Sequence, residues 1–159
     1  MKVLVCLLTL LLTLLLTGFA GNLARAQEDP PPKVKVTLVV ILASEKGKNI
    51  DKALTAIAEE VQAINPNFTS FKLKSMECKS MAKDEKAELK TVEGQKVQFV
   101  LRECANKKSK VCLAVTAPDQ GEIVYESICG KFLPIITRYE TKNQERLILA
   151  IRVMPCKGE

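Results

Sequence analysis

The chain has 159 residues, of which 47% are hydrophobic and 26% charged, a balance typical of one globular domain. It contains no histidine, which excludes Ser-His-Asp and Cys-His catalytic systems and imidazole metal ligands within the chain. The formal net charge is +6, and without Lys2 and Arg25 of the first 26 residues it is about +4. This mild charge, together with only 4% aromatic residues, argues against a nucleic-acid-binding surface.

The first 26 residues have the features of a secretory signal peptide. Lys2 gives a positive start, Val3–Leu16 is apolar, and Ala24 and Ala26 offer the small residues that predict cleavage after Ala26. The apolar run of about 14 residues is shorter than the ~20 that a membrane-spanning helix needs, so a retained anchor is the less favoured alternative. Export would place the mature chain in the periplasm, the cell envelope or the extracellular space, with no membrane span after cleavage.

Residues 27–33, with three consecutive prolines, predict a stiff linker, and a single β-rich domain is expected over 34–159. Val34–Ala43 is apolar on both faces of an alternating pattern, which predicts a central strand covered on both sides. A helix is expected over about 51–64, with Asn49 or Asp51 as its cap and an end at Asn65-Pro66. Its apolar stripe is formed by residues at three- and four-residue steps: Leu54, Ile57, Val61 and Ile64.

From residue 68 onward the pattern alternates with a period of two, which predicts about seven short strands. They are expected at 68–79, 87–91, 96–104, 110–117, 122–128, 132–139 and 147–153. The predicted fold class is therefore α+β and mostly β: an antiparallel β-sandwich or open roll with one packed helix.

The last two expected strands flank a polar turn, and a cysteine stands at each outer end of this hairpin. Cys129 and Cys156 are therefore the first-choice disulfide, and Cys104 and Cys112, placed on either side of another turn, are the second choice. Five cysteines remain after removal of Cys6 with the signal peptide, so at least one is unpaired or joins another molecule. Cys78 is an alternative partner for either pair, but we expect it to be free, as a buried thiol packed like a small hydrophobic side chain.

No complete catalytic or metal-binding motif accompanies these cysteines. They lack C-x-x-C spacing, the carboxylates are scattered, and Ser80-Met81-Ala82-Lys83 matches S-x-x-K without the companion motifs of the enzymes that use it. The sequence therefore predicts no catalytic residues, no cofactor and no metal. Asn67-Phe68-Thr69 fits an N-glycosylation sequon, which matters only for a eukaryotic source.

Several segments together resemble a group of small exported bacterial proteins of unknown function. The resemblance is carried by Leu42–Gly47 and the helix after it, by Phe71-Lys72-Leu73, and by Glu145–Ile151 with its "LILAI" sequence. It implies a signal peptide, a strand–helix opening, a β-rich remainder and bacterial export, and it implies no activity.

Two hypotheses of function follow from these observations. The first is a non-catalytic exported β domain that binds a protein or envelope partner, for instance through a sheet edge. The alternative is a small-ligand carrier, or an enzyme using carboxylates, lysines or a thiol, which a concave pocket with convergent charged groups would favour. The sequence leaves the oligomeric state open.

Overall fold

Eight strands, one α-helix and two short 3-10 helices make up the part of the chain that the computed structural model describes, residues 33–103 and 110–155. The strands are β1 (Val34–Ser44), β2 (Ser70–Met81), β3 (Lys86–Lys90), β4 (Lys96–Glu103), β5 (Lys110–Thr116), β6 (Glu122–Ile128), β7 (Phe132–Glu140) and β8 (Arg146–Pro155). The helices are η1 (Lys52–Leu54), α2 (Thr55–Ile64) and η2 (Val92–Gly94). Each expected strand is present, and the predicted fold class is confirmed.

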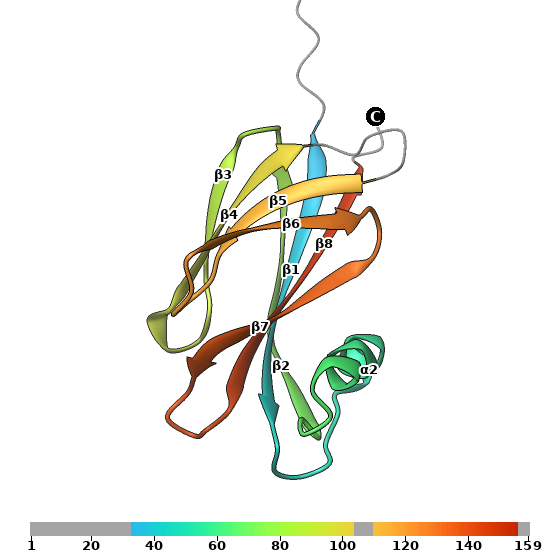
Figure 1. The fold of residues 1–159 in the computed structure, drawn as a ribbon, viewed down its shortest axis with the longest axis vertical. Helices are drawn as coiled ribbons and strands as arrows, with labels where there is room; N and C mark the ends of the chain where they lie inside the picture. The colour runs from blue at the N-terminus through green and yellow to red at the C-terminus, as the bar shows by residue number, and fades with distance from the viewer. Residues whose placement is uncertain (1–32, 104–109, 156–159) are drawn as a thin grey trace, which may run out of the picture. The chain divides into compact units, whose positions relative to one another are not determined.

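The strands form two antiparallel four-stranded sheets (Figure 1). Sheet A has the order β2-β1-β8-β7 and sheet B the order β3-β4-β5-β6. Apart from the β1–β8 pair, each hydrogen-bonded pair joins strands that are neighbours in sequence. The chain passes from sheet A to sheet B between β2 and β3, and returns between β6 and β7. All four of these strands are sheet edges, so the fold is an up-and-down meander closed by β1 and β8.

β1 is buried on both faces, as its sequence predicts. Residues at even positions from Val34 to Leu42 pack between the two sheets, together with Phe99 and Leu113 of sheet B. Val39, Ile41 and Ala43 face the opposite way and pack under α2. Two apolar layers therefore meet at this one strand, which explains why its sequence is almost continuously hydrophobic.

The predicted helix is formed, and three of its four stripe residues are buried: Leu54, Ile57 and Val61. The fourth, Ile64, is 65% exposed because the helix ends there, at Asn65, where the chain turns away. The capping prediction is wrong, since neither helical segment has a side-chain cap bond. The Asp51 carboxylate instead accepts a hydrogen bond from the backbone N–H of Leu73, at 2.7 Å, and so ties the start of the helix to β2.

The C-terminal hairpin is also formed, with β7 and β8 paired antiparallel. β8 lies inside sheet A between β1 and β7, and Leu147, Leu149 and Ile151 point into the core between the sheets. This explains the strongly apolar "LILAI" sequence, since Ile148 and Ala150 face the helix side. Within residues 33–103 and 110–155, no helix has both the length and the apolar character needed to cross a membrane.

Candidate functional site

Three of the cysteines singled out by sequence lie in the described residues: Cys78, Cys112 and Cys129. None of the three is bonded to another of them. Cys104 and Cys156 lie outside the described residues, so the pairs Cys129–Cys156 and Cys104–Cys112 remain predictions.

Cys112 lies on β5, half-buried between two carboxylates. It pairs with Glu126 of β6 on one side and with Glu103 of β4 on the other. Burial raises the pKa of the Cys112 thiol, and the negative charges of Glu103 and Glu126 raise this pKa further. Because the register is irregular between Leu101 and Glu103, Cys112 lies opposite Glu103, the residue before Cys104. The symmetric placement of Cys104 and Cys112 around the turn does not predict this register.

Cys129 lies in the turn between β6 and β7 and packs against the core between the sheets. The next residue, Gly130, donates its N–H to the carbonyl of Val153 in β8 at 2.8 Å, so this turn lies against the end of β8. Burial raises the pKa of the Cys129 thiol.

Cys78 is exposed, which corrects the expectation of a buried thiol. It lies on β2, an edge strand of sheet A, and faces away from sheet B. Its sulfur is 3.4 Å from the hydroxyl oxygen of Thr37 on β1. The sequence suggested burial because Cys is usually a buried residue type, but residue type alone does not show that β2 is a sheet edge.

The outer backbone edge of β2 is covered over one part only. Phe71 donates its N–H to the carbonyl of Asn49 at 2.8 Å and accepts from the N–H of Asp51 at 3.1 Å, an arrangement that includes a parallel bridge from Ile50 to Phe71. Over 74–80, no such outward backbone bond joins β2 to another described residue. β2 therefore has one stretch that already accepts an added segment and one that is open.

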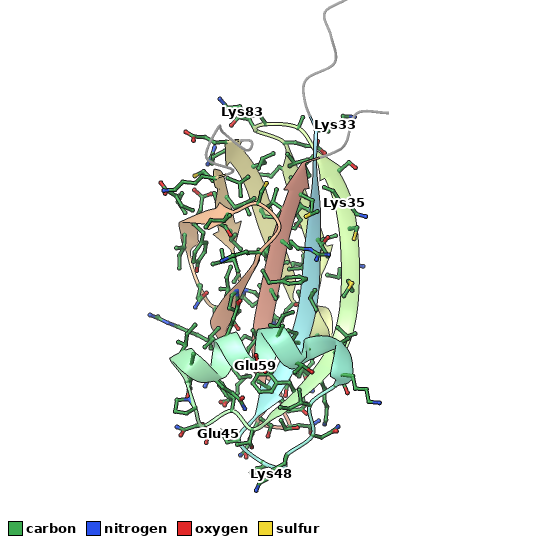
Figure 2. All side chains as sticks on the ribbon, turned by 90° about the vertical axis from the view of Figure 1, so that its right-hand side faces the viewer. Lys33, Lys35, Glu45, Lys48, Glu59 and Lys83 are labelled. Carbon is green, nitrogen blue, oxygen red and sulfur yellow. The ribbon has the colours of Figure 1, made fainter. Side chains whose placement is uncertain are left out.

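The outer face of sheet A is likewise covered over only part of its length (Figure 2). α2, on which Glu59 is labelled, crosses the lower half of this face, while the half near Lys35 has no helix over it. Met76 and Met154 are 51% and 40% exposed there. Beside them, the guanidinium of Arg152 lies 4.6 Å above the ring of Phe132, a cation–π arrangement.

A groove of about 440 Å³ opens beside β2, between the sheets. Buried Val40 and Leu42 of β1 provide apolar walls. Polar and charged side chains from β2, from the end of β3 and the connection after it, and from the β7–β8 turn line the rest: Lys74, Ser75, Glu77, Lys90, Thr91, Glu93, Thr141, Asn143 and Glu145. The groove therefore combines both signs of charge with apolar surface.

Glu93, in the β3–β4 connection, lines this groove with an unusual backbone conformation. Its φ of 52° lies in the left-handed region, which costs energy for a residue with a Cβ. The Tyr139 hydroxyl donates to Glu93 at 2.5 Å, and the backbone N–H of Lys142 donates to the same carboxylate at 3.5 Å. The Tyr139–Glu93 hydrogen bond, with burial and the Glu93 charge, raises the pKa of Tyr139.

A second charged group, Glu145, is fixed by Lys72, whose Nζ lies 2.9 Å from its carboxylate. Nearby, the Thr91 hydroxyl oxygen is buried and has no hydrogen-bond partner among the described residues. Such pre-positioned groups suit a ligand or chain segment that carries both charge and apolar surface. No group of three or more Cys, Asp and Glu side chains suited to a metal ion occurs in the described part of the chain.

Sequence reasoning did not identify the groove, because its walls come from four segments that are separate in the sequence. Gly94 indicated a turn, but no local pattern brings Glu93 to Tyr139 or Lys90 to Lys74. The S-x-x-K match does not lie on a helix, because Ser80 lies near the end of β2 and Lys83 lies in the following turn. Asn67 of the sequon is exposed in the turn after α2.

No family model, no curated protein and no solved structure matches the chain.

Proposed function

We propose that this chain is a non-catalytic, exported binding domain that takes an extended segment of a protein or envelope partner along the open edge of β2. The observation that carries this proposal is that one part of the β2 edge is already hydrogen-bonded to another segment while the rest is open. The edge accepts backbone bonds from Asn49–Asp51 at Phe71 and is open over 74–80. Unpaired edge groups are a ready template for another strand, and main-chain bonds give affinity without a demanding sequence.

The residues around this edge favour a partner that brings its own charges. Lys74 and Glu77 of β2 line the groove, with Lys90 and Glu93 on its opposite wall. An added strand beside β2 would therefore lie near both positive and negative side chains. These charges would determine the register in which the partner binds more than the strength of binding. Export by the predicted signal peptide would bring this edge into the periplasm, the envelope or the extracellular space.

Hydrogen exchange of the β2 amides tests the proposal. In the isolated chain the amides at the open edge over 74–80 exchange fast, and a bound strand slows them. β6, an edge of sheet B, is the matched control and keeps its exchange rate. If envelope extract contains a partner retained by the chain, and yet residues 74–80 exchange as before, the binding edge is not β2.

A second candidate function rests on the groove itself: a carrier of a small charged molecule. Five ionisable side chains, Lys74, Glu77, Lys90, Glu93 and Glu145, converge on about 440 Å³. Thermal unfolding in the presence of betaine, succinate or putrescine tests this candidate, since a bound ligand raises the unfolding temperature. A rise that Lys90→Ala abolishes supports the carrier, and the absence of any rise with all three probes contradicts it for these ligand classes.

A further inference from the structure

At the centre of the open stretch of β2, a cysteine lies between two residues of opposite charge. These residues are Glu77, Cys78 and Lys79, a negative charge, a thiol and a positive charge. All three residues lie on the edge strand of sheet A, which forms the right-hand margin of the face in Figure 2. Two copies of such a strand can pair with each other through the same surface, as in any two-fold symmetric interface.

Charge selects one register for that pairing. When two antiparallel copies are centred on Cys78, Glu77 of each copy lies opposite Lys79 of the other, which gives two attractive pairs. Centring on Glu77 or on Lys79 sets like charges directly against each other. A centre between two residues would set side chains of opposite sheet faces against each other, which antiparallel pairing does not allow. The centre at Cys78 is therefore the electrostatically favoured one.

The same register brings two exposed thiols together. Directly opposite residues of antiparallel strands have Cα atoms about 4.5–5.5 Å apart. A disulfide requires Cα atoms about 4.4–6.8 Å apart, so both kinds of antiparallel pair fall within its range. Cys78 lies on the outer face of sheet A with its sulfur 3.4 Å from the Thr37 hydroxyl oxygen, and the residue is exposed. An odd number of cysteines in the expected mature chain also leaves one for another molecule.

We propose that the partner of the β2 edge is a second copy of this chain, joined to the first by a Cys78–Cys78 disulfide. This inference rests on the proposed function, in which the β2 edge binds an added strand. It identifies the added strand as β2 of a second copy. The two four-stranded A sheets become one continuous eight-stranded sheet across the two-fold axis. The disulfide fixes the register that the Glu77–Lys79 pairs select.

The covalent step needs an oxidant, and a small disulfide such as oxidised glutathione supplies it. One Cys78 thiolate attacks the small disulfide, releases one thiolate and forms a mixed disulfide. The second Cys78 thiolate attacks the protein sulfur of that mixed disulfide and releases the other small thiolate. One S–S bond forms between the copies, two electrons pass to the oxidant, and the two protons lost by the Cys78 thiols end on its two released thiols.

The experiment uses the complete exported chain in a buffer of oxidised and reduced glutathione. Dimer formation is followed by non-reducing electrophoresis, and the linkage is mapped by mass spectrometry of peptides. We expect a covalent dimer whose linking peptide contains Cys78 twice, and no covalent dimer from Cys78→Ser. A chain that stays monomeric, with Cys78 free or bound to glutathione, overturns the inference. So does a dimer linked through another cysteine.

A charge swap tests the register while leaving Cys78 in place. Glu77→Lys sets Lys opposite Lys79 in both pairs, and we expect the covalent dimer to form about tenfold more slowly. Adding Lys79→Glu to this variant reverses both pairs and restores the original rate. Glu59→Lys on the exposed face of α2 carries the same change of charge and leaves the rate unaltered. A Glu77→Lys chain that dimerises as fast as the unsubstituted chain contradicts the register.

The exchange measurement separates failure of this inference from failure of the proposed function. If the chain stays monomeric but residues 74–80 are protected by an envelope partner, the edge binds a strand and only its identity as a second copy is wrong. If residues 74–80 exchange fast both at high chain concentration and with envelope extract, the edge binds nothing and both proposals fall. Circular dichroism of each variant confirms that the sheets are retained.

Discussion

The hydroxyl of Tyr139 donates a hydrogen bond to the carboxylate of Glu93 at 2.5 Å, and so joins β7 of sheet A to the connection between two strands of sheet B. Glu93 has a left-handed backbone with a φ of 52°. Because this bond holds a strained residue at the edge of the groove, it couples the stability of the sandwich to the shape of the candidate site.

The Tyr139–Glu93 bond predicts a loss of stability at alkaline pH. The raised pKa of Tyr139 means that the fold favours the neutral phenol, so the stabilisation is complete below pH ~10, the pKa of an unfolded tyrosine. It is lost as pH rises through the raised pKa of the folded state. We expect Tyr139→Phe to unfold at lower urea concentration near neutral pH, and to lose less stability above pH ~10 than the unsubstituted chain.

A titration of the phenol identifies the cause. In a Tyr125→Phe background, Tyr139 is the chain's single tyrosine and its ionisation is followed by ultraviolet absorbance. Glu93→Gln should lower the pKa of Tyr139 towards its ordinary value. An unchanged titration curve would show that Glu93 does not raise it.

The carboxylate of Asp51 predicts a local effect on β2. Asp51→Ala removes the acceptor for the Leu73 N–H and should lower the free energy of unfolding by about 1 kcal/mol. Asp51→Asn keeps a neutral acceptor and should lose less. Urea unfolding measures the stability, and faster exchange of the Leu73 amide shows that the effect is at this bond. Equal loss in both variants would argue against an acceptor role.

A buried residue and an exposed residue of the helical stripe should respond differently to truncation. Ile57 lies on the buried face of α2 and is 4% exposed, and Ile57→Ala should cost about 2–5 kcal/mol by removing buried surface and leaving a cavity. Ile64 is 65% exposed, and Ile64→Ala should change the stability by less than about 0.5 kcal/mol. Urea unfolding of the two variants makes the comparison. Equal losses would mean that Ile64 packs in solution.

The three described cysteines should differ in reactivity under reducing conditions. Cys78 is exposed and should be alkylated first by iodoacetamide. Burial raises the pKa of both Cys112 and Cys129, so their thiolate fractions stay small until the pH exceeds the ordinary thiol pKa of ~8.5. Peptide mass mapping at a series of pH values measures the order. Early labelling of Cys112 near neutral pH would contradict the burial of its thiol.

The predicted Cys129–Cys156 disulfide can be tested through stability. It would close a loop of about 28 residues, and the chain-entropy model gives about 3.5 kcal/mol for such a loop. Cys156→Ser should lower the free energy of unfolding under oxidising conditions by about that amount, and should change nothing in reductant. Non-reducing peptide mapping identifies the pair directly. Two free thiols at Cys129 and Cys156 would show that the hairpin is not linked.

The strands could be predicted because the sequence of each is either alternating or apolar throughout. Which of the two patterns occurs depends on whether one or both faces of the strand are buried. Val34–Ser44 is apolar on both faces because the core between the sheets lies on one side and α2 on the other. Period-two patterns mark which face of a strand is buried, so they also located β4, β5 and β8 within a few residues.

Other features depend on register and on distant neighbours, which periodicity does not contain. The irregularity between Leu101 and Glu103 sets Cys112 opposite Glu103, and no pattern of residue types announces it. The exposure of Cys78 follows from the position of β2 at a sheet edge, which pairing decides. The groove needs side chains from β1, from β2, from the β3–β4 connection and from the β7–β8 turn. Local sequence therefore gives strands and faces, while sites made between strands require the folded chain.

The pairing of β1 with β8 also has a consequence for the order of synthesis. β1 is made first and β8 last, yet each is the other's neighbour at the centre of sheet A, along a register from Val34 with Pro155 to Ala43 with Arg146. Until β8 leaves the ribosome, β1 has β2 alone as a partner and the apolar surface that β8 covers stays bare. The domain therefore completes its core only after its last strand is synthesised, and such long-range pairing is typical of slow folding.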